Sequence, residues 1–307
     1  MVYTLTLNPS LDYVMTVNNI IFGNVNRSSA EELYYGGKGI NVAAVLTRLV
    51  IETTALGFAG GKTGEILYEI MKRDGINYDF ISLSCGNTRI NVKLKSDNET
   101  EINALGPKIT EAEIKELFKK LENIKSGDTL ILAGNVPNSL PNDFYAQIMS
   151  QLCDKDIYFT VDATGNQLIS SLKYKPFLIK PNCYELGEIF GKELTSRDDI
   201  IKYGKELQNM GAQNVIISCG GDGAVLIDQN NGVHTANAVK GNVLGTVGCG
   251  DSMVAGFIAG KLKGYDFHRA FQLSVACASA TAFSAHLATE DKINEILAQN
   301  FISDYNI

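Results

Sequence analysis

The sequence contains no tryptophan, only three histidines and no two cysteines close enough to form a C-x-x-C motif. Its six cysteines are spread along the chain, so neither a structural zinc site nor a disulfide framework is expected. The three histidines leave little with which to build a metal cluster. We therefore expect free thiols and a cytoplasmic location. The cysteines are Cys85, Cys153, Cys183, Cys219, Cys249 and Cys277.

The chain also lacks long apolar runs and an excess of positive charge. No uncharged apolar stretch approaches the roughly 20 residues of a membrane span, and the first residues lack the basic start of a signal peptide. The net charge of −7 argues against nucleic-acid and membrane-surface binding, so an anionic ligand would need a local basic pocket. No linker or repeat divides the 307 residues, and we expect one domain over 1–307.

What is present is an alternation of strand-like and helix-like segments, which predicts an α/β fold with a doubly wound, mostly parallel sheet flanked by helices. Residues at about 10–35 and 86–106 do not fit this alternation. In the second of these segments, Arg89, Asn91 and Lys93 alternate with apolar residues and would share one face of a strand. We expect these two segments to form a small β-sheet lid that carries cations over a site.

A glycine-rich turn at residues 245–250 leads into an apolar helix, with Asp251 in the first turn of that helix. Free N–H groups and the helix dipole at such a turn suit an anion. Two interpretations remain open from these residues alone. Asp251 is either a base beside an anion hole, as phosphoryl transfer requires, or an ordinary acidic residue favoured by the dipole.

A second glycine cluster, residues 36–41, opens another apolar helix and contains Lys38 and Asn41. No Ser or Thr follows Lys38, and the Gly61-Lys62-Thr63 tripeptide lacks a glycine at the required distance, so a P-loop is excluded. Asp12 follows the first predicted strand. It is either a turn residue or a ligand-binding group at the carboxyl end of that strand, where α/β folds place their sites.

The two glycine motifs, in this order and about 210 residues apart, resemble those of the ribokinase-like (PfkB) family of sugar kinases over essentially the full chain. Gly245 and Cys249 replace the family's usual Asp and Ala, which removes neither the N–H donors nor the base. The segments 4–12, 24–27, 88–89, 106–107 and 134–137 are similar to the phosphosugar branch, whose members act on fructose 1-phosphate or tagatose 6-phosphate. Residues 89–93 and 282–289 are more similar to the fructose 1-phosphate enzymes.

The resemblance implies that Asp251 is the general base for phosphorylation of fructose 1-phosphate at its C6 hydroxyl by ATP, with Mg²⁺. It implies an anion hole of three N–H groups, a sugar-binding set, a nucleotide-binding set and Glu185 as the group that organises the metal. The anion hole comprises Gly248, Cys249 and Gly250. The sugar-binding set comprises Asp12, Gly37, Lys38, Asn41, Arg89, Asn135, Arg27 and Lys93. The nucleotide-binding set comprises Lys180, Asn182, Ser218, Gly220, Gly221, Asp222, Gly223 and Gly250.

Alternatives remain at three points. Taken without the resemblance, Lys180, Asn182 and Glu185 suit a capping or surface role. A tagatose-6-phosphate kinase fits the same motifs, and so does a non-catalytic protein that responds to a phosphosugar. The exposed edge of the β lid also allows a homodimer.

Overall fold

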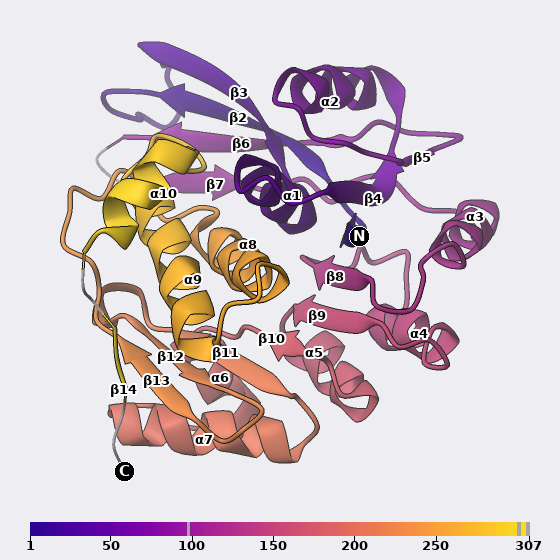
Figure 1. The fold of residues 1–307 in the computed structure, drawn as a ribbon. Helices are drawn as coiled ribbons and strands as arrows, with labels where there is room; N and C mark the ends of the chain where they lie inside the picture. Colours follow the sequence, from indigo (N-terminus) through magenta and orange to yellow (C-terminus); the bar gives the residue numbers. More distant parts are fainter. Residues whose placement is uncertain (97–98, 300–301, 305–307) are drawn as a thin grey trace.

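The computed structural model describes residues 1–96, 99–299 and 302–304. A ten-stranded sheet runs through its centre in the order β14-β13-β12-β11-β10-β9-β8-β1-β4-β5 (Figure 1). The strands from β5 to β11 pair in parallel, whereas β12, β13 and β14 add an antiparallel edge. Their bounds are β1 Val2–Thr6, β4 Thr53–Ala59, β5 Ile81–Ser82, β8 Thr129–Ala133, β9 Tyr158–Asp162, β10 Leu178–Ile179, β11 Asn214–Ser218, β12 Ala224–Ile227, β13 Val233–Ala236 and β14 Ile302–Asp304.

Helices cover both faces of this sheet and bury two separate apolar clusters. Within β11, Ile216 belongs to one cluster and its neighbours Val215 and Ile217 to the other, as the period of two in a strand requires. This pattern confirms the predicted doubly wound α/β architecture. The first cluster contains residues of α1 Lys38–Arg48, α2 Gly61–Arg73, α8 Cys249–Leu262, α9 Phe267–Ala282 and α10 Glu290–Leu297. The second contains residues of α3 Glu111–Leu121, α4 Phe144–Gln151, α5 Gly165–Ser171, α6 Cys183–Phe190 and α7 Arg197–Asn209.

A second, four-stranded sheet lies beside the first, in the order β3-β2-β6-β7 (Figure 1). It comprises β2 Ser10–Thr16, β3 Ala30–Gly36, β6 Arg89–Lys95 and β7 Thr100–Ile102, so both predicted lid segments contribute to it. The expected alternation in β6 is present: Asn91 and Lys93 are buried, whereas Ile90 is 44% exposed. The polar face of the strand therefore points into the protein, which is the reverse of an ordinary surface strand.

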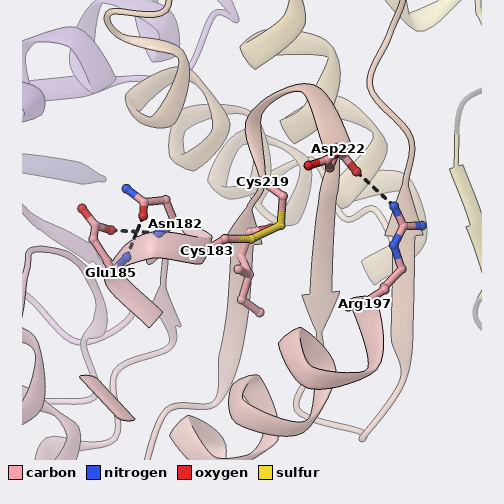
Figure 2. Close-up of a disulfide and its surroundings, with 7 residues drawn as sticks. Asn182, Cys183, Glu185, Arg197, Cys219 and Asp222 are labelled. Atoms are coloured by element: carbon pink, nitrogen blue, oxygen red, sulfur yellow. Dashed lines mark hydrogen bonds between the residues drawn. A yellow bond between two sulfur atoms is a disulfide. The ribbon is translucent and has the colours of Figure 1, made fainter. Parts of the chain in front are cut away.

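The expectation that all cysteines are free is wrong, because Cys183 and Cys219 form a disulfide (Figure 2). The two residues are 36 positions apart in sequence, but β10 and β11 are neighbours in the sheet and Asn182 pairs with Ser218 at their carboxyl ends. Each cysteine follows one of these paired residues, so the fold brings the two sulfurs together.

The other cysteines, Cys85, Cys153, Cys249 and Cys277, are free. None of the helices in the described ranges has the length and apolar character that a membrane crossing requires.

Candidate active site

A cavity of about 880 Å³ opens where the strands of the large sheet end. Thr6 at the end of β1, Ala133 at the end of β8, Lys180 after β10 and Ser218 at the end of β11 all line it, as expected for a parallel α/β sheet. The structure brings most of the predicted residues to this one cavity. These are Asp12, Gly37, Lys38, Asn41, Arg89, Asn135, Lys180, Asn182, Glu185, Ser218, Gly220, Gly221, Gly223, Gly248, Cys249, Gly250 and Asp251.

Asp251 lies in the first turn of α8 and is only 5% exposed. Gly248 caps this helix with a φ of 80°, and a Cβ at that position would lie 2.6 Å from Leu287 Cδ2, so the turn requires glycine. Asn41 of α1 donates a hydrogen bond of 2.8 Å from Nδ2 to Asp251 Oδ2. The two glycine motifs, far apart in sequence, therefore meet at the Asp251 carboxylate.

Burial raises the pKa of Asp251 to about 6. Lys38 opposes this shift, the negative charge of Asp162 adds to it, and the hydrogen bond from Asn41 lowers the pKa because it stabilises the charged form. A carboxylate with this pKa is ionised at neutral pH and is a stronger base than an ordinary aspartate. This is the balance that a general base needs.

The position of this pKa predicts how activity depends on pH. We expect kcat/KM to fall about tenfold per pH unit below about pH 6, because the protonated Asp251 cannot accept a proton. Replacing Asn41 with Ala removes the stabilising hydrogen bond and should move the acid limb to higher pH. A phosphate group on a substrate also titrates near pH 6. An acid limb at the same pH in wild type and Asn41→Ala would therefore assign it to the substrate instead of Asp251.

The sequence-based assignment did not include Asp162, which lies at the end of β9 and pairs with two lysines of the cavity wall. Its Oδ1 lies 3.2 Å from Lys38 Nζ and 3.5 Å from Lys180 Nζ, and the residue is 2% exposed. Burial alone would raise the pKa of Asp162, but Lys180 and Lys38 together lower it below its usual value. In turn Asp162 raises the pKa of Lys38, against the effect of burial. The expectation that Asp12 lies at the carboxyl end of the first strand is wrong, because Asp12 lies within β2 of the four-stranded sheet. Asp162, the last residue of β9, is the carboxylate that fits that rule.

The N–H groups at the start of α8 differ in their availability. The first i→i−4 bond of the helix is from Ser252 N to Gly248 O, at 2.8 Å, so Gly250 and Asp251 precede the helical ladder. Cys249 N already donates to Thr246 O at 3.3 Å. Burial, with a contribution from Asp251, raises the pKa of the Cys249 thiol to about 11, so this thiol stays protonated at neutral pH.

The β2–β6 side of the cavity carries a hydrogen-bonded polar network. Asp12 Oδ1 accepts from Ser10 Oγ at 2.7 Å and from Asn91 Nδ2 at 3.0 Å, while Asp12 Oδ2 lies 3.0 Å from Lys93 Nζ. Lys93 is thus paired with Asp12 and does not line the cavity, which differs from its predicted role. Neither does Arg27, an exposed residue between β2 and β3. The sequence places both cations on the lid, but neither reaches the cavity, and this depends on how the strands pair.

Arg89 is the cation of β6 that does line the cavity. Its guanidinium donates to two backbone carbonyls, Asn8 O at 3.2 Å and Ala104 O at 3.0 Å. Burial lowers the pKa of Arg89 from its ordinary value, and Asp12 partly opposes that shift. These carbonyls orient the guanidinium without neutralising its charge, so it can still attract an anion.

The opposite wall consists of the N-terminus of α6 and the loop after β11 (Figure 2). Asn182 caps α6 and Glu185 reciprocates, with bonds of 2.8 Å in both directions. Asn182 and Glu185 therefore do cap the helix, as expected of them without the family resemblance, and both also line the cavity. Asp222 does not line it; its backbone carbonyl accepts from Arg197 Nη2 at 3.0 Å. In the part of the chain that the structure describes, no three His, Cys, Asp or Glu residues form a ready metal cluster.

Comparison with known proteins identifies the class to which this fold and site belong. Residues 5–292 match the family model described as pfkB family carbohydrate kinase. This chain belongs to that family. A carbohydrate kinase transfers a phosphoryl group to an alcohol, so the protein is a phosphotransferase.

Individual relatives are similar over nearly their whole length. The chain is 44% identical to the 1-phosphofructokinase of Bacillus subtilis over 97% of this chain and 98% of that one. It is 35% identical to the D-tagatose-1-phosphate kinase of Bacillus licheniformis over 97% of this chain and 98% of that one. The crystal structure of Escherichia coli phosphofructokinase-2 in complex with fructose-6-phosphate superposes with a TM-score of 0.90 at 29% identity, covering 97% of this chain and 98% of that one.

Proposed function

We propose that this kinase phosphorylates the C6 hydroxyl of fructose 1-phosphate with ATP and releases fructose 1,6-bisphosphate. The observation that carries the proposal is the buried Asp251 carboxylate, which has a raised pKa and lies in the same helical turn as backbone N–H donors. A base and an anion hole in one turn suit the transfer of a phosphoryl group to a hydroxyl.

In the proposed reaction, the C6 oxygen attacks the γ-phosphorus of ATP as the bond from that phosphorus to the β,γ-bridging oxygen breaks. Asp251 accepts the C6 proton, and ADP leaves with the bridging oxygen. The N–H groups of Gly248 and Gly250, helped by that of Cys249, stabilise the charge on the transferring group. Asn41 Oδ1 is buried with no partner among the described residues, so it is free to accept a hydrogen bond from a sugar hydroxyl close to Asp251.

The opposite wall suits the nucleotide. Lys180 and Lys38 bring two ammonium groups to the cavity, and the loop that includes Ser218, Gly220 and Gly221 offers backbone that a ligand can approach closely. Mg²⁺ is commonly held by one or two carboxylates together with substrate phosphates, and the Glu185 carboxylate in the cavity wall fits that arrangement, directly or through water. Bound there, the ion would neutralise part of the charge on the phosphates.

Arg89 would bind the phosphate already present on the sugar, since its charge is oriented by carbonyls only. Truncating one partner of a buried charge pair costs about 2–5 kcal/mol, and we expect Arg89→Ala to raise KM for fructose 1-phosphate by about 30-fold or more. The KM for ATP should change little. Arg73, which is exposed and paired with Asp74, provides the matched arginine control. Equal KM increases for both substrates in Arg89→Ala would contradict the phosphate-binding role.

The substrate is tested by assaying ATP-dependent turnover of fructose 1-phosphate, tagatose 1-phosphate, tagatose 6-phosphate, fructose 6-phosphate and fructose. The highest kcat/KM with fructose 1-phosphate supports the proposal. A preference for either tagatose phosphate would keep the proposed mechanism and change the sugar substrate. Tagatose 1-phosphate is included because the chain is 35% identical to a D-tagatose-1-phosphate kinase. If the protein binds a phosphosugar but turns over none of them, it is the non-catalytic regulator.

We further propose that residues 1–307 act as one kinase unit. The four-stranded sheet would be its lid, and two copies of the chain would pair through this lid. Phe22 and Val25, in the connection between β2 and β3, are 94% and 85% exposed, and such apolar side chains suit burial against a second copy. The E. coli phosphofructokinase-2 has been crystallised in a tetrameric inhibited form. Light scattering that gives the mass of a single chain at assay concentrations would exclude pairing.

A further inference from the structure

The Cys183–Cys219 disulfide joins two parts of the cavity wall (Figure 2). Cys183 is the first residue of α6 and directly follows Asn182, which lines the cavity. Cys219 directly follows Ser218 and precedes Gly220, both of which also line it. The covalent bond therefore holds the helix cap and the glycine loop at a fixed separation, on the wall that we assign to the nucleotide.

The two cysteines of the disulfide are partly exposed. Both cysteines are half-buried and line a second cavity of about 380 Å³, behind the Ser218–Gly220 wall. Asn182, Ser218, Gly220 and Ala224 line both cavities, so the disulfide belongs to a thin partition between them. A small thiol or disulfide can enter the second cavity without displacing a ligand from the first.

We propose that Cys183 and Cys219 form a reversible redox site that sets the affinity of this kinase for its nucleotide. A low-molecular-weight disulfide, RSSR, supplies the oxidising equivalents. One cysteine thiolate attacks RSSR and releases RS⁻, which takes up the proton that the cysteine lost. The second cysteine then attacks the mixed disulfide and releases a second RSH. Two cysteine thiols and RSSR thus become one protein disulfide and two RSH, and a small dithiol reverses the exchange.

The consequence for affinity follows from the loop itself. Without the disulfide, the turn is held by backbone bonds such as Cys219 N to Gly223 O at 2.8 Å and by Arg197 Nη2 to Asp222 O at 3.0 Å. Gly220 and Gly223 have φ values of 55° and 91° in this turn, and glycine has wide conformational freedom when it is released. Ordering such a loop costs affinity. The oxidised form should therefore bind ATP more tightly than the reduced form.

The inference rests on the proposed nucleotide site, and its test separates the two. Peptide mapping of protein treated with oxidised glutathione should find Cys183 linked to Cys219, whereas denatured protein that was first reduced with dithiothreitol should titrate all six thiols. Reduction should raise the dissociation constant of a non-hydrolysable ATP analogue, measured by calorimetry, roughly 3- to 10-fold. KM for fructose 1-phosphate should not change. The calorimetric measurement needs no turnover, so it remains valid if the substrate assignment fails.

Matched variants identify the cysteines responsible. The Cys183→Ser and Cys219→Ser variants should show the reduced affinity under both treatments, whereas Cys153→Ser, at an exposed free cysteine, should respond as the wild type does. Six titratable thiols after oxidation, or equal nucleotide affinity in the two wild-type states, would overturn the proposal. So would a Cys183→Ser variant that still responds to oxidation, because the response would then come from another thiol such as Cys249. The wild-type comparison is sufficient if a variant fails to fold.

Discussion

Replacing Asp251 with Asn should lower kcat by at least ~10²-fold, the lower end of general-base effects. The substitution keeps the size of the side chain and removes its basicity. Asp251 is buried, and it receives a hydrogen bond from Asn41. Among the described residues, Asp251 is the acidic residue in the first turn of α8, beside the N–H groups of that turn. The measurement is steady-state turnover at saturating ATP and fructose 1-phosphate.

Binding measurements distinguish a lost base from a lost fold. Asp251→Asn should bind both ligands with affinities close to those of the wild type, because removing a buried negative charge does not weaken the attraction of Lys38 and Lys180 for phosphate. Asp143→Asn, at an exposed carboxylate outside the cavity, is the matched control and should keep full activity. A kcat for Asp251→Asn within about threefold of the wild-type value would rule out general-base catalysis by this residue.

Local pattern was sufficient to predict much of this site. The glycine turns at Gly37 and Gly248 are visible in the sequence because each combines glycines with the start of an apolar helix. The alternation in β6 likewise predicts that Arg89, Asn91 and Lys93 share a face. The parallel sheet explains the convergence only of the groups at its own strand ends, such as Lys180 and Ser218, since those ends meet at one edge. Arg89 reaches the same cavity from the four-stranded sheet.

Features that depend on strand order could not be predicted in the same way. The Cys183–Cys219 disulfide requires β10 and β11 to be adjacent, and the pairing of Lys93 with Asp12 requires β2 to lie beside β6 in a particular register. The spacing of residues in the sequence shows neither which strands are adjacent nor the register in which they pair. Asp162 is a different case. Its position at the end of a strand can be predicted from the sequence, but its ion pairs depend on which lysines the neighbouring elements place beside it.

Asp162 interacts electrostatically with the other charged residues of the site, namely Lys38, Lys180 and Asp251. It holds Lys38 and Lys180 beside each other in the absence of phosphate, and it also raises the pKa of Asp251 through its negative charge. A site built to receive a highly charged nucleotide needs cations, and two ammonium groups this close repel each other. The Asp162 carboxylate offsets that repulsion, so the same residue stabilises the fold and tunes the base.

Asp162→Asn should therefore lower the free energy of unfolding by about 3 kcal/mol, the lower end of the cost of breaking a buried ion pair. The variant leaves Lys180, which is 5% exposed, without the carboxylate nearest to it. Urea unfolding in phosphate-free buffer measures the change. Asp79→Asn is the control, because its ion pair with Lys120 is exposed and should contribute no more than about 1 kcal/mol.

Two further results identify the charge as the cause. Adding Lys180→Met to Asp162→Asn should recover much of the lost stability, because the double variant no longer buries an unpaired ammonium. The folded-state pKa of Asp162 is lowered, so its contribution is present above its unfolded pKa and is lost as pH falls through the folded value. The difference in stability between wild type and Asp162→Asn should accordingly shrink in acid. A difference that stays constant from neutral to acidic pH, with no recovery in the double variant, would mean that packing, and not charge, makes Asp162 necessary.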